Sequence, residues 1–122
     1  HASDKDLPFP EASFGIVGLE TAVALLLDAF VPGIISPSRL VELLSLRPAR
    51  VFGLPGGTLR PGAPADVTLI DPDREWVIDP AGFHSLGRNT PFAGRRVRGR
   101  VVRTLVGGRT VFQLAGAGVS HR

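Results

Sequence analysis

The chain has 122 residues, 43% of them hydrophobic and 20% charged, a composition typical of a soluble globular protein with one small core. It has no cysteine, which excludes disulfides, thiolate metal sites and cysteine nucleophiles and fits a cytoplasmic location. The longest apolar run, residues 21–27, is too short to cross a membrane, so no membrane partner is expected. The sequence begins at His1 and has no methionine, so we expect a segment of a longer protein.

The first predicted helix spans residues 17–30. Its apolar residues recur at the spacing of one helix face, and Ala24 and Leu25 widen that face, so the helix should be covered on most sides. A loop with Gly15 and Gly18 precedes it. This loop either presents backbone N–H groups to an anion or is a tight turn leading into a core helix.

Two shorter helical segments are predicted next. Ser36 has the side chain of an N-cap and Pro37 suits the first helical position, so a helix is predicted over 37–45. A further helical turn is predicted to start at Pro48 and to end at Gly53.

The second half of the chain predicts strands. Residues 67–70 and 75–79 are expected to form two strands separated by a turn over 71–73. Trp76 and Ile78 should share one face of the second strand, because side chains alternate along a strand.

A hairpin is predicted near the end of the chain. Residues 101–106 and 109–113 are joined by two glycines, which suit a type I′ turn because both of its central residues need positive φ. A short helical turn is expected over 80–83, and the polar tail after residue 113 is expected to be disordered.

The net charge of +3 comes mostly from arginine. Residues 96–101 alternate arginine with valine or glycine, which is typical of one solvated strand face. No nucleic-acid partner is therefore expected. The alternative, an arginine-rich nucleic-acid binder, predicts binding that weakens steeply with salt.

Residues 14–22, 57–66 and 88–94 resemble three runs of dihydroorotases of class I type, which are zinc enzymes of the amidohydrolase superfamily. Residues 14–22, Phe-Gly-Ile-Val-Gly-Leu-Glu-Thr-Ala, resemble the loop and helix after the eighth barrel strand. Residues 57–66 match the signature G-x-L-x-x-G-x-x-A-D, which marks the return into a small β-domain. Residues 88–94, Arg-Asn-Thr-Pro-Phe-Ala-Gly, resemble a run near the C-terminus of the family.

The resemblance implies an α/β fold: the C-terminal portion of a TIM-barrel metal-dependent hydrolase plus the C-terminal strands of its small β-sandwich domain. Residues 1–54 would supply the strand-eight loop and last helices of the barrel. Residues 55–114 would supply the β-domain strands, with 115–122 as a tail.

The resemblance also implies three substrate-binding positions. His1 matches a histidine that binds a substrate carboxylate in the family, or alternatively a histidine next to the catalytic aspartate. Phe14 and Gly15 match a pair whose backbone atoms hold the substrate. Ser13 departs from the family, which often has proline there. Asn89 and Thr90 are given a structural role only, with their side chains bonding their own backbone.

No catalytic or metal-binding residue is predicted within the chain. Its three histidines have no metal-ligand spacing, and a zinc site needs three or four converging ligands. In the family, the ligands of one or two zinc ions and the strand-eight aspartate would lie upstream of His1. The isolated chain is therefore predicted to bind no zinc and to be inactive.

The function implied for the whole protein is that of a dihydroorotase, which interconverts N-carbamoyl-L-aspartate and L-dihydroorotate in pyrimidine biosynthesis. Expected partners are this small-molecule substrate, the upstream part of the same protein, a second copy in a homodimer and, further, aspartate carbamoyltransferase. Two alternatives are a non-catalytic dihydroorotase-like subunit that supports that transferase, and a related cyclic-amide hydrolase such as an allantoinase or hydantoinase.

Overall fold

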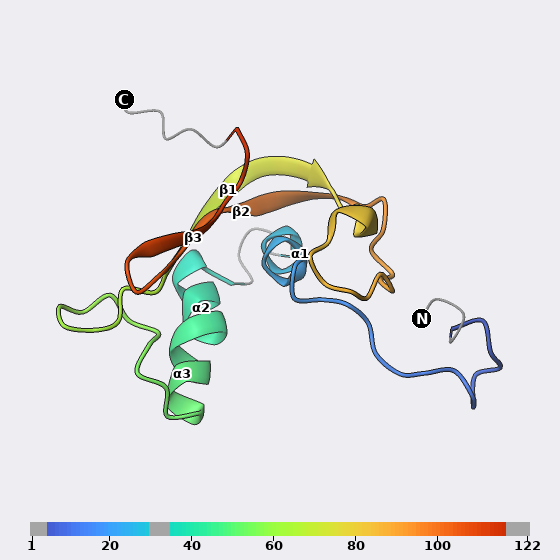
Figure 1. Ribbon diagram of the computed structural model, residues 1–122, viewed down its shortest axis with the longest axis horizontal. Helices are drawn as coiled ribbons and strands as arrows, with labels where there is room; N and C mark the ends of the chain where they lie inside the picture. The colour runs from blue at the N-terminus through green and yellow to red at the C-terminus, as the bar shows by residue number, and fades with distance from the viewer. Residues whose placement is uncertain (1–4, 30–34, 117–122) are drawn as a thin grey trace.

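The computed structural model describes residues 5–29 and 35–116. Its centre is an antiparallel sheet in the order β1-β2-β3, formed by Val67–Val77, Arg96–Val106 and Arg109–Gln113. Helix α1, Ala22–Ala29, lies against one face of the sheet, and the N-terminal arm runs away from it (Figure 1). In the part of the chain that is described, no helix is long and apolar enough to cross a membrane.

Helix α1 begins later than predicted. Residues 19–21 instead form a turn, in which the N–H groups of Thr21 and Ala22 both donate to the Gly18 carbonyl. Val17 precedes this turn, and its N–H donates to the Asn89 carbonyl of another loop. Of the described side chains of α1, only that of Ala24 is buried, because the face of α1 turned away from the sheet is only partly covered.

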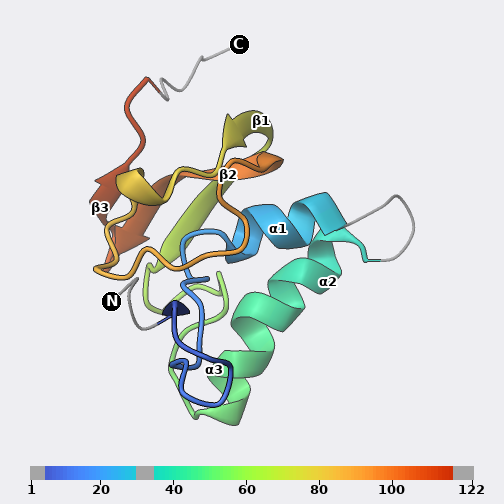
Figure 2. The ribbon, with the colours of Figure 1, turned by 90° about the vertical axis from the view of Figure 1, so that its right-hand side faces the viewer.

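The second and third helices form one continuous helical run rather than the two separate segments predicted (Figure 2). Helix α2 spans Pro37–Val41, a π-helical turn η2 spans Glu42–Leu46, and α3 spans Arg47–Val51. The N–H of Arg47 bonds the Glu42 carbonyl five residues back. The π-turn thereby changes the bonding pattern just before Pro48, which has no N–H to donate.

The N-cap prediction is confirmed. The Ser36 hydroxyl accepts a hydrogen bond from the N–H of Arg39 at 3.2 Å, and Pro37 occupies the first turn. The hydroxyl satisfies a backbone donor that has no partner within the helix.

Strand β1 is a single strand, so the prediction of two strands with a turn between them is wrong. Asp71 pairs with Arg100 and Glu75 pairs with Arg98, which leaves residues 72–74 as an irregularity within β1. The Asp71 carboxylate accepts from the N–H of Asp73 at 3.1 Å. The turn-forming residues therefore make a bulge, while pairing with β2 continues on both sides of it.

The hairpin prediction is confirmed, although β2 begins at Arg96 rather than at residue 101. Gly107 and Gly108 have φ values of 55° and 76°, as a type I′ turn requires. The short helical turn is also confirmed, as a 3-10 helix, η3, over Pro80–Gly82.

The core lies between α1 and the sheet. Four of its buried apolar residues are Ala24, Ile78, Phe83 and Val97, and Trp76 packs against them, on the same side as Ile78, as predicted. Many large apolar side chains of the described residues are exposed instead. The most exposed are Phe9, Phe14, Leu19, Leu59 and Leu86.

Candidate functional site

The predicted substrate loop lies just before the turn that leads into α1. Gly15 has φ of 95°, a left-handed conformation that favours glycine, and the space around it is open. The Phe14 side chain is 95% exposed. His1, the third predicted position, lies outside the described residues, so its distance from Phe14 and Gly15 stays a prediction.

Asn89 binds this loop at two points. Its side-chain Nδ2 donates to the Gly15 carbonyl at 2.8 Å, and its backbone carbonyl accepts from the N–H of Val17 at 2.8 Å. The prediction that Asn89 bonds its own backbone is therefore wrong, whereas Thr90 does so, accepting from the N–H of Phe92 at 3.3 Å. Asn89 is 74 residues from Gly15 in the chain, and no local sequence pattern predicts that contact.

Lys5 is a second residue that sequence reasoning did not assign to the loop. Its Nζ donates to the Gly15 carbonyl at 2.9 Å and to the Ser13 carbonyl. The sequence signal that could have singled it out is that it is the chain's only lysine.

An open hollow of about 1030 Å³ lies at this loop. It carries the cationic side chains of Lys5 and Arg88, and none of the described residues that line it is acidic. The lining residues are Lys5, Ser13, Phe14, Gly15, Ile16, Val17, Leu86, Gly87, Arg88, Asn89 and Thr90. Lys5 Nζ and Arg88 Nη1 both donate to backbone carbonyls, and their positive charge favours an anionic ligand in the hollow.

Glu20, in the turn just before α1, binds the start of the segment that carries Asn89. Its carboxylate accepts from the N–H of His84 at 3.0 Å, and from the N–H and hydroxyl of Ser85 at 2.9 and 2.7 Å. Partial burial acts to raise the pKa of Glu20, but the bonds from Ser85 and His84 outweigh it and hold the pKa below its usual value. The carboxylate is thus a charged anchor for the start of this segment.

The amidohydrolase family matches residues 9–111, which is most of the chain and includes this loop and the Asn89 segment. The chain belongs to the amidohydrolase family.

Relatives of this amidohydrolase chain agree with that assignment. A protein from Anaeromyxobacter dehalogenans strain 2CP-1, named dihydroorotase, is 54% identical over 112 residues, covering 92% of this chain and 26% of its own length. A solved L-hydantoinase from Arthrobacter aurescens is 38% identical with a TM-score of 0.78, covering 84% of this chain and 24% of that one. A solved D-hydantoinase is 30% identical with a TM-score of 0.82, covering 93% and 25%.

The chain therefore spans about a quarter of the length of the curated relatives it matches. The described part of this amidohydrolase is a small antiparallel sheet with a few helices, as expected for a piece of a larger α/β protein.

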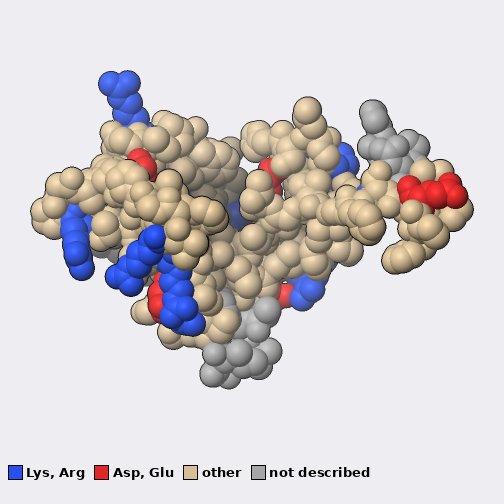
Figure 3. All heavy atoms as spheres, turned by 90° about the horizontal axis from the view of Figure 1, so that it is seen from below, with Lys and Arg blue, Asp and Glu red and all other residues tan. Residues whose placement is uncertain are grey.

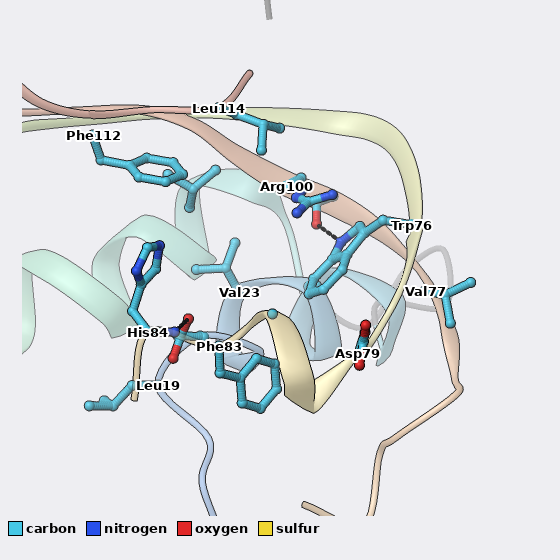
Figure 4. Close-up of a pocket in the computed structure, with 15 residues that line it drawn as sticks. Leu19, Val23, Trp76, Val77, Asp79, Phe83, His84, Arg100, Phe112 and Leu114 are labelled. Atoms are coloured by element: carbon cyan, nitrogen blue, oxygen red, sulfur yellow. Dashed lines mark hydrogen bonds between the residues drawn. The ribbon is translucent and has the colours of Figure 1, made fainter. Parts of the chain in front are cut away.

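A second cavity of the amidohydrolase chain, of about 540 Å³, lies between α1, η3 and the sheet (Figure 4). The Trp76 indole N–H donates to the Gly99 carbonyl at 3.0 Å, and the Arg100 guanidinium lies 4.7 Å from the centre of the indole ring. Burial and then the charge of Arg74 lower the pKa of Arg100. His84 and Phe112 meet edge to face at 6.5 Å on the opposite wall.

Arg96 and Arg98 of β2 are exposed and lie near one carboxylate, whereas Arg100 of the same strand is partly buried against Trp76. Arg98 lies 3.2 Å and Arg96 lies 3.8 Å from the carboxylate of Glu75. Arg95 pairs with Asp28 of α1 at 2.7 Å. Basic side chains are spread over the face seen from below, with other residues between them (Figure 3). Arg95, Arg96 and Arg98 are thus exposed arginines with acidic neighbours, and such surface pairs contribute little to stability.

No metal centre is found among the described residues. Within residues 5–29 and 35–116, no three His, Cys, Asp or Glu side chains come together in a way that could hold a metal ion.

Proposed function

We propose that the chain is part of a dihydroorotase, which catalyses the reversible cyclisation of N-carbamoyl-L-aspartate to L-dihydroorotate. The observation that carries this proposal is the 54% identity to a relative named dihydroorotase, over 92% of the chain. The hydantoinases that resemble the chain in structure are more distant in sequence, at 38% and 30% identity.

The chemistry of the loop hollow supports the same choice. Dihydroorotate carries a carboxylate, and N-carbamoyl-aspartate carries two. The hollow offers the cations of Lys5 and Arg88 and no described acidic side chain. Backbone amides of Phe14 and Gly15, with His1, would hold the substrate, because fixed N–H donors and a cationic surrounding favour carboxylates.

The remainder of the site would lie outside these 122 residues. We propose that the chain supplies the last helices of a TIM barrel and the C-terminal strands of a β-sandwich domain. Zinc, as one or two ions, would be bound by the upstream part of the protein. Exposed apolar side chains such as Phe9, Leu59 and Leu86 support this arrangement, because apolar surface of this extent commonly packs against a partner.

We also propose the partners, the location and the zinc content of the protein. The upstream part of the protein would be the main partner of this chain, and a homodimer in the cytoplasm, with or without aspartate carbamoyltransferase, would be the working form. The isolated chain would bind no zinc and catalyse nothing. Stoichiometric zinc in the purified 122-residue chain would contradict that expectation.

Two alternatives remain. The structural likeness to hydantoinases, with TM-scores of 0.78 and 0.82, favours a related cyclic-amide hydrolase such as a hydantoinase or allantoinase. The second alternative, a non-catalytic subunit that supports aspartate carbamoyltransferase, depends on the upstream part of the protein, where the metal ligands would lie.

The test is a substrate comparison on the full-length protein. We expect turnover of dihydroorotate and of N-carbamoyl-aspartate, with far lower kcat/KM for hydantoin and allantoin. A preference for hydantoin or allantoin would replace the proposal by the first alternative. No turnover of any of these, together with activation of aspartate carbamoyltransferase, would replace it by the second.

A further inference from the structure

The loop at Phe14 and Gly15 is poorly anchored by its own side chains. Phe14 is 95% exposed and Ile16 is 58% exposed, and no described heavy atom lies within 4 Å of the position of a Cβ on Gly15. Burial of apolar surface therefore contributes little to holding this loop in one conformation. Among the described residues, the loop is held by hydrogen bonds to residues outside it.

Those hydrogen bonds go to carbonyl groups of the loop. Asn89 Nδ2 and Lys5 Nζ donate to the Gly15 carbonyl, and Lys5 Nζ also donates to the Ser13 carbonyl. A trans peptide places its C=O and N–H on opposite sides. The N–H groups of Phe14 and Ile16 consequently point away from the two tethers.

Those N–H groups remain open to a ligand in the described structure. None of the described residues accepts a hydrogen bond from the N–H of Phe14, Gly15 or Ile16. The next N–H, that of Val17, donates to the Asn89 carbonyl, so the N–H groups without a described acceptor end at Ile16.

The Asn89 segment is itself held firmly at both ends. The Glu20 carboxylate binds the N–H groups of His84 and Ser85 on one side. On the other side, Phe92 packs against the core. Asn89 therefore links the folded core to a loop that has little packing of its own among the described residues.

We propose that Asn89 is a positioning residue for substrate binding: by holding the Gly15 carbonyl, it fixes the peptide that carries the N–H of Ile16, and with it the conformation of the loop whose open N–H groups bind the substrate carboxylate. This inference rests on the proposed function, because it takes the loop to be part of the substrate site. Asn89 acts through Gly15 and touches no reacting atom.

The test uses the full-length protein with Asn89→Ala and, as a second variant, Asn89→Asp. The aspartate keeps the size of the side chain, and its backbone carbonyl still accepts from the N–H of Val17. Its side chain, however, replaces the N–H donor by an oxygen that faces the Gly15 carbonyl. We expect KM for dihydroorotate to rise about fivefold or more, as for loss of one hydrogen bond. The value of kcat should fall less than about twofold, because the lost contact stabilises the bound substrate and the transition state equally.

Ser36→Ala is the matched control. It removes one hydrogen bond of similar kind, at the start of α2 and away from the loop hollow, so it should lower the unfolding temperature and leave KM unchanged. A wild-type KM in both Asn89 variants overturns the inference while the proposed function stands. A fall in kcat with unchanged KM overturns it too. A full-length protein without dihydroorotase activity overturns the proposed function and this inference together.

Discussion

Leu27 of α1 fills the space where a side chain on Gly99 would lie. An ideal Cβ on Gly99 would be 2.4 Å from Leu27 Cδ1, and Gly99 has φ of 91°. Helix and sheet therefore approach each other at a residue that has no Cβ and adopts a backbone conformation that L residues rarely adopt. This contact sets how closely α1 packs on β2.

Gly99→Ala should destabilise the protein by about 2 to 4 kcal/mol, because the new methyl group displaces Leu27 and the backbone is strained. Urea unfolding of the wild-type and variant proteins measures the difference. Gly82→Ala is the control, since Gly82 has no described heavy atom within 4 Å of its Cβ position and no positive φ. Equal stability of the Gly99 variant and wild type would contradict the close packing.

Glu20→Gln should change how stability depends on pH. The folded pKa of Glu20 lies below the ordinary value of 4.5, so the charged carboxylate stabilises the fold above that pH. This contribution is lost as the pH falls through the lowered pKa. The unfolding temperature of wild type should therefore exceed that of the variant at neutral pH, and the two should converge in acid.

Thermal unfolding followed between about pH 3 and about pH 7 checks this expectation. Glu11→Gln, which changes an exposed side chain in the N-terminal arm, serves as the control and should follow the wild-type curve. A constant difference between Glu20→Gln and wild type at every pH would show that the charge of Glu20 does not stabilise the fold.

Local patterns in the sequence were sufficient for much of the fold. The Ser36 cap and the turn at Gly107 and Gly108 were predicted because each depends on neighbouring residues only. The prediction at residues 71–73 was wrong for a physical reason: Asp71 and Asp73 have turn chemistry, but β2 pairs with the chain on both sides of them. Pairing with a neighbouring strand outweighed the local preference.

The candidate site was less accessible to sequence reasoning. The Phe14–Gly15 pair and the Asn89 run were both identified by resemblance, yet nothing in either run indicated that they bond each other across 74 residues. Lys5 was not assigned to the loop either. Long-range polar contacts depend on the assembled fold, and they follow no periodicity that a single sequence displays.

Ser36→Ala should destabilise the helical run that begins at Pro37. Its hydroxyl accepts from the N–H of Arg39 at 3.2 Å, and loss of an N-cap costs about 1 kcal/mol. Ser38→Ala is a matched control, because Ser38 is exposed in the first turn. Urea unfolding should separate the two variants, and equal stabilities would show that the cap contributes nothing.

Arg100→Ala should alter the fluorescence of the chain's only tryptophan. The guanidinium lies 4.7 Å from the centre of the Trp76 ring, and its removal takes away a partly buried cation–π contact of about 0.5 to 1 kcal/mol. Arg100→Lys keeps a positive charge and should have a smaller effect. If the full-length protein contains further tryptophans, a Trp76→Phe spectrum subtracts their emission. An unchanged Trp76 spectrum and unchanged stability in Arg100→Ala would mean that the guanidinium does not cover the indole in solution.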